Sequence, residues 1–135
     1  MNVLVDTSVW SLALRRNPAD LSSRENKLVD RWSALVRADH GVLIGPIRQE
    51  ILSGIIDRKI FNRLRLALLG FPDATMQVSD FECAAQFFNQ CRSEGKTGSP
   101  IDLLICAIAF RHQMRILTAD DDFQFYALHL PIRLL

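Results

Sequence analysis

The sequence predicts an α/β fold built on a parallel sheet that helices cover on both faces. Three short, mostly apolar segments at residues 3–5, 42–44 and 115–118 have β-strand character, and longer segments of helical periodicity separate them. Strands without a polar face belong to sheets that are buried on both sides, and parallel strands need crossover helices to connect them. At 135 residues the chain has the length of one domain. We therefore expect a single domain spanning residues 1–135.

Capping residues mark where the helices between these strands begin. Ser22 or Ser23 precedes a segment with its apolar residues on one face, and Pro46 and Pro100 each stand where a first helical residue is expected. The sequence thus predicts helices at residues 9–15, 22–38, 46–52, 57–69 and 79–95, from Pro100 onward, and from the acidic run 120–122 onward. Residues 131–135 are predicted to form a last edge strand.

The composition excludes several classes of protein. Sixteen basic and fifteen acidic residues leave a formal charge of +1, which argues against a strongly basic nucleic-acid binder. The three cysteines show no C-x-x-C spacing, so we expect neither a disulfide scaffold nor a zinc site, and a reducing cytoplasm is the expected location. The N-terminus lacks a basic segment and reaches Asp6 early, unlike a signal peptide. Because the longest apolar run, residues 103–110, is too short to cross a bilayer, we expect a soluble protein without membrane association.

Acidic residues follow the strands and open the helices of this predicted sheet. Asp6 ends the first strand, Glu50 lies in the helix after the second, Asp102 lies in the first turn of a later helix, and Asp120 and Asp122 follow the third strand. In parallel α/β sheets, ligands bind beyond the carboxyl ends of the strands. We therefore expect these carboxylates to meet at one edge of the sheet.

Each of these acids also has a purely structural interpretation. Asp6 suits a turn, Glu50 a solvated helix face, Asp102 a capping box with Ser99, and the run 120–122 the positive end of a helix dipole. Several carboxylates at one edge, however, repel one another unless a cation or a shared proton compensates. Oxygen ligands without histidine or cysteine favour a hard ion, Mg²⁺ with Mn²⁺ as a substitute, over zinc. The acids together are therefore interpreted as a metal site.

Four segments, in this order, resemble the motifs of PIN domains. They are Asp-Thr-Ser-Val-Trp at residues 6–10, Pro-Ile-Arg-Gln-Glu-Ile-Leu-Ser-Gly at 46–54, Asp-Leu-Leu-Ile-Cys-Ala-Ile-Ala at 102–109 and Leu-Thr-Ala-Asp-Asp-Asp-Phe at 117–123. Length, motif order and spacing are similar to those of VapC-type ribonuclease toxins of type II toxin–antitoxin pairs. The resemblance implies a PIN-like three-layer α/β/α sandwich with a short, mostly parallel central sheet. One departure is Cys106, which stands where the family usually has a small residue such as alanine.

The resemblance also implies an activity and a set of site residues. Asp6, Glu50, Asp102 and Asp120 match the family's acidic quartet, with Asp122 as an auxiliary metal ligand. The implied function is that of a Mg²⁺-dependent endoribonuclease that cleaves structured RNA, tRNA or rRNA. Mg²⁺ held by carboxylates activates water for attack on a phosphodiester and polarises the phosphoryl oxygen. Asp6 and Asp102 are expected as direct ligands, while Glu50 and Asp120 complete the shell or accept a proton from the water.

Hydroxyl and aromatic side chains beside these motifs are further candidates. Thr7, Ser8 and Thr118 are suited to orienting ligands or binding a substrate phosphate, and equally to turns and caps. Trp10 is interpreted mainly as a core residue, with stacking on an RNA base as the alternative.

The resemblance implies two protein partners. A cognate antitoxin would restrain the enzyme, and the chain would form a homodimer through the apolar helices at residues 57–69 or 81–91, for which core packing is the alternative. The charge of the remaining residues also favours RNA as a partner. Without the acidic quartet, eleven acidic residues stand against sixteen basic ones, an excess of five positive charges.

Two other functions compete with the nuclease. A phosphotransfer receiver module requires a pair of acids near the first strand and a lysine after a late strand, and the sequence has neither. A non-catalytic PIN-like module that only binds RNA or protein is the stronger alternative. It ranks below the nuclease because all four quartet acids are present.

Overall fold

The computed structural model describes residues 1–135 and contains a short sheet among seven α-helices. In chain order the elements are β1 (Val3–Val5), α1 (Thr7–Leu14), the 3-10 turn η1 (Pro18–Asp20), α2 (Ser23–Arg37), β2 (Gly41–Val42), α3 (Gly45–Leu52), α4 (Arg58–Leu68), α5 (Val78–Ser93), α6 (Pro100–Arg111), β3 (Arg115–Leu117) and α7 (Asp122–His129).

The sheet has the order β2-β1-β3, and both of its pairings are parallel. Leu4 lies opposite Val42 on one side and Ile116 on the other, so β1 is the central strand. All three residues of β1 are buried, as expected for a strand covered on both faces. Because the strands are parallel, their carboxyl ends share one edge of the sheet.

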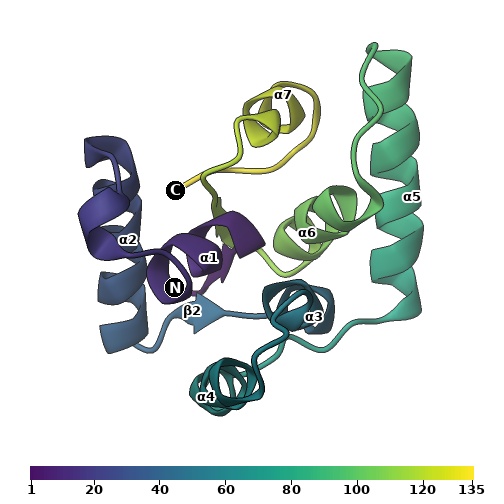
Figure 1. Cartoon of the computed structure of the whole chain (residues 1–135). Coiled ribbons are helices and arrows are strands. Elements are labelled where there is room, and N and C mark those ends of the chain that lie inside the picture. The colour runs from purple at the N-terminus through teal and green to yellow at the C-terminus, as the bar shows by residue number, and fades with distance from the viewer.

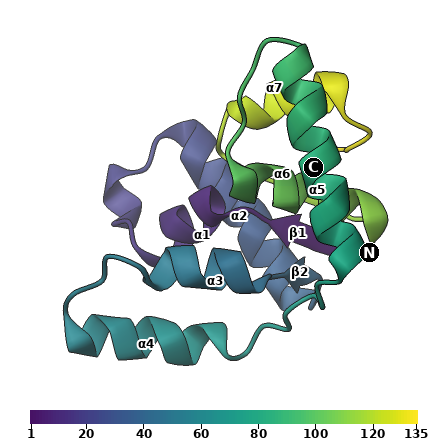
Figure 2. The same ribbon diagram turned by 90° about the vertical axis from the view of Figure 1, so that its right-hand side faces the viewer.

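Helices cover the sheet on both sides, which confirms the predicted three-layer α/β/α sandwich. Figure 1 shows α1 and α2 on one side of the sheet and α5 and α6 on the other. Helix α6 packs against β1 and β3, and α5 packs against α6. The seven residues from Leu103 to Ala109 in α6 are all buried, because a helix that is apolar all round needs cover on every side. Figure 2 shows α4 beside α3 at the lower edge of the molecule. None of the helices is long and apolar enough to cross a membrane.

Side-chain caps form at the starts of two of the predicted helices. Ser22 and Glu25 make a reciprocal capping box at the start of α2. The Asp57 carboxylate accepts a hydrogen bond from the Ile60 N–H at the start of α4, at 3.0 Å. These contacts satisfy amide groups that have no partner inside a helix, which explains why the sequence located both helix starts to within a residue.

Two predicted strands differ in the structure. The segment 42–44 is a strand only at Gly41–Val42, because Leu43 turns aside to bridge Asp73. The edge strand predicted at residues 131–135 is wrong, since the segment makes one isolated parallel bridge, between Leu134 and Ile116. Pro131 offers no N–H at the start of this segment, so the ladder cannot extend through it.

Trp10 is a core residue, and the alternative that it stacks on a base is wrong. Its side chain is fully buried, and its indole N–H donates to the carbonyl oxygen of Val5 at 3.0 Å. The ring makes edge-on contacts with Trp32 and Phe71, with centroids 5.6 and 4.8 Å away. A side chain held on every side in this way has no free face for a base.

Two charged residues are buried, Asp6 at the carboxyl edge of the sheet and Asp80 at the start of α5. Asp80 accepts hydrogen bonds from the Gln77 N–H and from Arg111 Nε, both at 2.8 Å, and His112 Nε2 lies 3.4 Å from it. Burial by itself raises the pKa of this carboxyl, but the hydrogen bonds outweigh burial and leave the pKa below its ordinary value. Asp80 therefore links the start of α5 to the end of α6 as a buried, ionised group.

Candidate metal centre

The expected acids lie where the carboxyl edge of the sheet meets the first turns of helices. Asp6 directly follows β1 and immediately precedes α1, and Asp102 lies in the first turn of α6. Asp120 lies in the short connection from β3 into α7, and Asp122 is the first residue of α7. Helix starts carry partial positive charge, which favours carboxylates at these positions.

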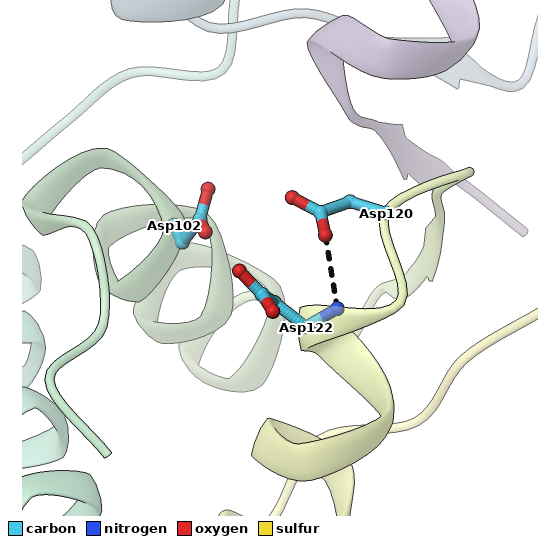
Figure 3. A group of neighbouring side chains, drawn as sticks. All are labelled: Asp102, Asp120 and Asp122. Atoms are coloured by element: carbon cyan, nitrogen blue, oxygen red, sulfur yellow. Dashed lines mark hydrogen bonds between the residues drawn. The ribbon is translucent and has the colours of Figure 1, made fainter.

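Three of the acids form a compact cluster. One carboxylate oxygen from each of Asp102, Asp120 and Asp122 lies within 4.8 Å of the other two. Figure 3 shows the three side chains facing one another across the gap between α6 and the start of α7. Asp120 is fixed from within the connection, because its Oδ1 accepts a hydrogen bond from the Asp122 N–H at 2.9 Å.

Asp6 adjoins this cluster and is held by two hydroxyl groups. Ser8 and Thr118 both donate to Asp6 Oδ2, at 2.6 and 2.9 Å, and the Asp6 side chain is not used to cap α1. The same hydroxyls accept hydrogen bonds from backbone amides, Ser8 from Ala119 and Thr118 from Asp120. They therefore join the end of β1 to the loop after β3 and fix the direction in which the Asp6 carboxylate points.

Asp102 is the acid whose electrostatic environment differs most from water. Its pKa is raised to about 6, mainly by burial, and also by the negative charges of Asp6, Asp120 and Asp122. A hydrogen bond from the Tyr126 hydroxyl at 3.0 Å opposes this rise. Burial is therefore the main reason why Asp102 is harder to ionise than a carboxyl in water, and its acidic neighbours add to the effect.

The capping box suggested for Asp102 is only half formed. Ser99 Oγ accepts a hydrogen bond from the Asp102 N–H at 3.2 Å, but the Asp102 carboxylate turns to Tyr126 instead of back to the start of the helix. The backbone of Asp102 therefore serves the helix cap, and its side chain belongs to the acidic cluster.

Glu50 lies apart from the compact cluster. It is exposed in the last turns of α3, and its Oε1 accepts a hydrogen bond from Thr7 Oγ1 at 2.8 Å. Thr7 follows Asp6 in the chain, so this contact anchors Glu50 beside the Asp6 end of the site. The structure does not bring its carboxylate into the group of three oxygens.

The run of three aspartates is divided between two environments. Asp120 and Asp122 belong to the cluster, whereas Asp121 points outward and forms an exposed ion pair with Arg24 of α2 at 2.8 Å. Asp122 also forms an ion pair, with Lys96 at 3.0 Å.

Sequence reasoning missed two residues that contact the cluster, Tyr126 and Lys96. Tyr126 lies four residues after Asp122, one helical turn further along α7, and this spacing was a usable signal. Lys96 lies in the loop before α6, and nothing in its spacing indicated that it meets Asp122. The predicted hydroxyl residues Thr7, Ser8 and Thr118 all donate to carboxylates of the site.

The donor chemistry of the cluster fits a divalent metal ion. It consists of carboxylate oxygens only, without histidine or cysteine, which is the ligand set that Mg²⁺ and Mn²⁺ prefer. Burial and the neighbouring carboxylates both disfavour the ionised form of Asp102, which a bound cation would favour.

Comparisons with known proteins agree on the family. The model of the PIN domain matches residues 3–127. The chain is 32% identical over 127 residues to VapC ribonuclease Mb1587 of Mycobacterium bovis and to ribonuclease VapC11 of Mycobacterium tuberculosis, which covers 93% of this chain and 91% of each relative. The solved structure of FitAB bound to an IR36 DNA fragment covers 98% of this chain and 93% of its own, with a TM-score of 0.73 and 24% identity. FitAcB from Neisseria gonorrhoeae matches with a TM-score of 0.70 and 23% identity, over 98% of this chain and 96% of its own. The two structures share the fold, and the sequence matches show that the chain belongs to the PIN-domain family, among its VapC-type members.

Proposed function

We propose that this protein is a Mg²⁺-dependent endoribonuclease that acts as the toxin of a toxin–antitoxin pair and cleaves structured RNA, tRNA or rRNA. The observation that carries the proposal is the cluster of Asp102, Asp120 and Asp122 at the carboxyl edge of the sheet, with Asp6 beside it. The relatives named ribonucleases support RNA as the substrate.

Each residue of the site has a distinct part in this proposal. Asp6, Asp102 and Asp120 would hold the ion, which when bound supplies charge neutralisation at phosphorus and lowers the pKa of a water molecule. Tyr126 orients the carboxylate of Asp102 through its hydrogen bond. Ser8 and Thr118 do the same for Asp6. Groups that orient ligands in this way typically contribute about 10–100-fold to metal affinity or activity.

Glu50 is the candidate proton acceptor. Glu50 is exposed, it accepts a hydrogen bond from Thr7, and it lies outside the compact cluster. Its carboxylate is therefore free to take a proton from the attacking water. Thr7 therefore orients Glu50, and we propose the same orienting role for all three hydroxyl residues in preference to direct contact with the substrate phosphate.

A cleavage experiment tests the proposed function. The purified protein is expected to cut tRNA or rRNA at defined positions in Mg²⁺ or Mn²⁺, and to stop when EDTA is added, because carboxylates alone cannot neutralise the phosphodiester. Sequencing the 5′ ends of the fragments identifies the target. Binding of the same RNA without cleavage in either ion would contradict the nuclease and favour the non-catalytic binding module.

The exposed face of α4 offers a surface for the RNA backbone. Arg58, Lys59, Arg63 and Arg65 are all exposed on this helix, and none of them forms an ion pair or a side-chain hydrogen bond. The apolar face, with Leu64 and Leu68, is buried. Figure 2 shows α4 running beside α3, the helix that carries Glu50. We propose that this basic face binds phosphates of the substrate on either side of the cleaved bond.

Removing charge from this face is expected to weaken RNA binding. In the Asp102→Asn background, which prevents cleavage, adding Lys59→Gln and Arg63→Gln should reduce affinity and lower the slope of log K against log salt concentration by about 1 to 2, because fewer counterions are released. Filter binding over a salt series measures both quantities. The control, Lys27→Gln with Arg37→Gln on α2, removes the same charge elsewhere. Equal losses in the two double variants would contradict a binding role for α4.

We further propose that residues 1–135 act as one domain, that the protein works as a homodimer in the cytoplasm, and that a cognate antitoxin protein binds it. The support for these assignments is membership of the VapC-type group. Exposed apolar residues on α4 and α5, Leu66 and Phe81 among them, are candidates for these contacts. Light scattering of the purified protein tests the dimer.

A further inference from the structure

Lys96 is a fixed cation at the rim of the acidic cluster. Its ammonium lies 3.0 Å from Asp122 Oδ1 and 5.8 Å from the centroid of the Phe125 ring, and its side chain is 32% exposed. The backbone is held as well, because the Lys96 N–H donates to the Cys91 carbonyl oxygen at 3.0 Å after Gly95 has turned the chain with a φ of +98°.

The loop that carries Lys96 packs closely against α6 and α7. A Cβ at Gly98 would lie 3.1 Å from Tyr126 and would approach Leu103 even more closely, so a larger residue here would displace one of these side chains. The position of Lys96 relative to the cluster is therefore set by the fold on both sides of the loop.

This contact makes the three clustered acids unequal. Asp122 forms an ion pair with the Lys96 ammonium, whereas Asp102 and Asp120 form no ion pair. To bind a divalent ion, Asp122 would have to give up its pair with Lys96 or bring that ion close to a second cation. Asp102 and Asp120 face neither cost.

We propose that Lys96 is a positioning residue that withholds Asp122 from the metal, so that Asp102 and Asp120 bind the ion and Asp122 does not. The inference rests on the proposed metal-dependent nuclease and replaces the role of auxiliary ligand expected for Asp122. It agrees with the preference of Mg²⁺ for one or two carboxylates with the remaining positions left to water and substrate phosphate. Lys96 thus limits the protein's own ligands and keeps the ion open to RNA.

A purely structural Lys96 would behave differently. If the ion pair only fastened the loop to α7, removing the ammonium would loosen Asp122 and leave metal binding unchanged or weaker. If Lys96 withholds Asp122, removing the ammonium frees a carboxylate and also removes a repelling charge, so metal binding becomes tighter. The two roles therefore predict opposite signs.

Calorimetric titration of the RNA-free protein with Mn²⁺ separates these roles. K96M is expected to lower the Mn²⁺ dissociation constant by about two- to fivefold, which is the effect of an exposed ion pair, whereas K96R, which keeps the charge, should match the unchanged protein. D122N should change the constant by no more than about fivefold. D120N, which removes a ligand, should weaken binding by more than about tenfold.

The outcomes distinguish the inference from the function on which it rests. A K96M protein that is folded by circular dichroism and binds Mn²⁺ no more tightly than the unchanged protein overturns the role of Lys96. D122N binding as weakly as D120N overturns it as well. In both cases the proposed nuclease stands if the unchanged protein binds Mn²⁺ and cleaves RNA. If the unchanged protein does not bind Mn²⁺, the proposed function fails together with the inference.

Discussion

Replacing Asp6 by asparagine is expected to lower the rate of Mg²⁺-dependent RNA cleavage by more than about a hundredfold, because groups that merely orient a metal ligand already contribute about 10–100-fold. Asp6 is 5% exposed and borders the acidic cluster, so its negative charge would act on a bound ion with little screening by water. Asparagine has nearly the same shape, and the hydroxyls of Ser8 and Thr118 can rotate to accept from its amide. The loss should therefore fall on catalysis and not on folding.

The measurement is the single-turnover rate on the RNA identified by fragment sequencing, together with circular dichroism of the variant. Asp30→Asn on α2 is a matched control, because Asp30 is exposed and makes no side-chain hydrogen bond or ion pair. This control should cleave at the rate of the unchanged protein. If Asp6→Asn also cleaves at that rate, the metal-site interpretation of the whole cluster is wrong.

Replacing Asp80 by alanine is expected to reduce the free energy of unfolding by about 2–4 kcal/mol without altering the acidic cluster. The change leaves the Gln77 N–H without a partner and removes the carboxylate that balances Arg111. Arg111 is 35% exposed, so water recovers part of the loss and the effect stays below that of a fully buried pair. Urea denaturation measures the difference. Glu82→Ala, an exposed acid in the same helix, should change stability by less than about 0.5 kcal/mol.

The effect of Asp80 should depend on pH in one direction. Because the pKa of Asp80 is lower in the folded protein than its ordinary value, its contribution is fully present above the unfolded pKa of about 4. The contribution is lost as pH falls through the lower, folded pKa. The stability gap between the unchanged protein and Asp80→Ala should therefore shrink as the pH falls below about 4. A gap that does not shrink below about pH 4 would show that Asp80 is not held ionised by its partners.

The elements that the sequence located best are those whose signals are local. Two helix caps form through contacts between residues three positions apart, Ser22 with Glu25 and Asp57 with Ile60. Such caps can be recognised from a few neighbouring residues. The strand predicted at residues 131–135 fails for the opposite reason. Its apolar, β-prone residues meet only one bridge to Ile116, and whether a partner edge is available depends on the rest of the fold.

The acids were predictable as a group, but their individual environments were not. Asp6, Glu50, Asp102, Asp120 and Asp122 all occur where predicted strands end or helices begin, and topology alone directs such positions to one edge of the sheet. The contact of Asp122 with Lys96, and that of Asp102 with Tyr126, join residues 26 and 24 positions apart. No periodicity spans such separations.

The sequence by itself determined the α/β class, the main helices and the presence of a carboxylate-rich edge, because these depend on apolar patterning and on local capping. Only the tertiary structure decided that Asp121 faces outward while Asp120 and Asp122 face Asp102. The same holds for the packing of Trp10 against Trp32 and Phe71, and for the ion pair between Lys96 and Asp122. The physical reason is that side-chain electrostatics and burial depend on which distant segments pack together. That packing is a property of the whole core and not of any local stretch of the chain.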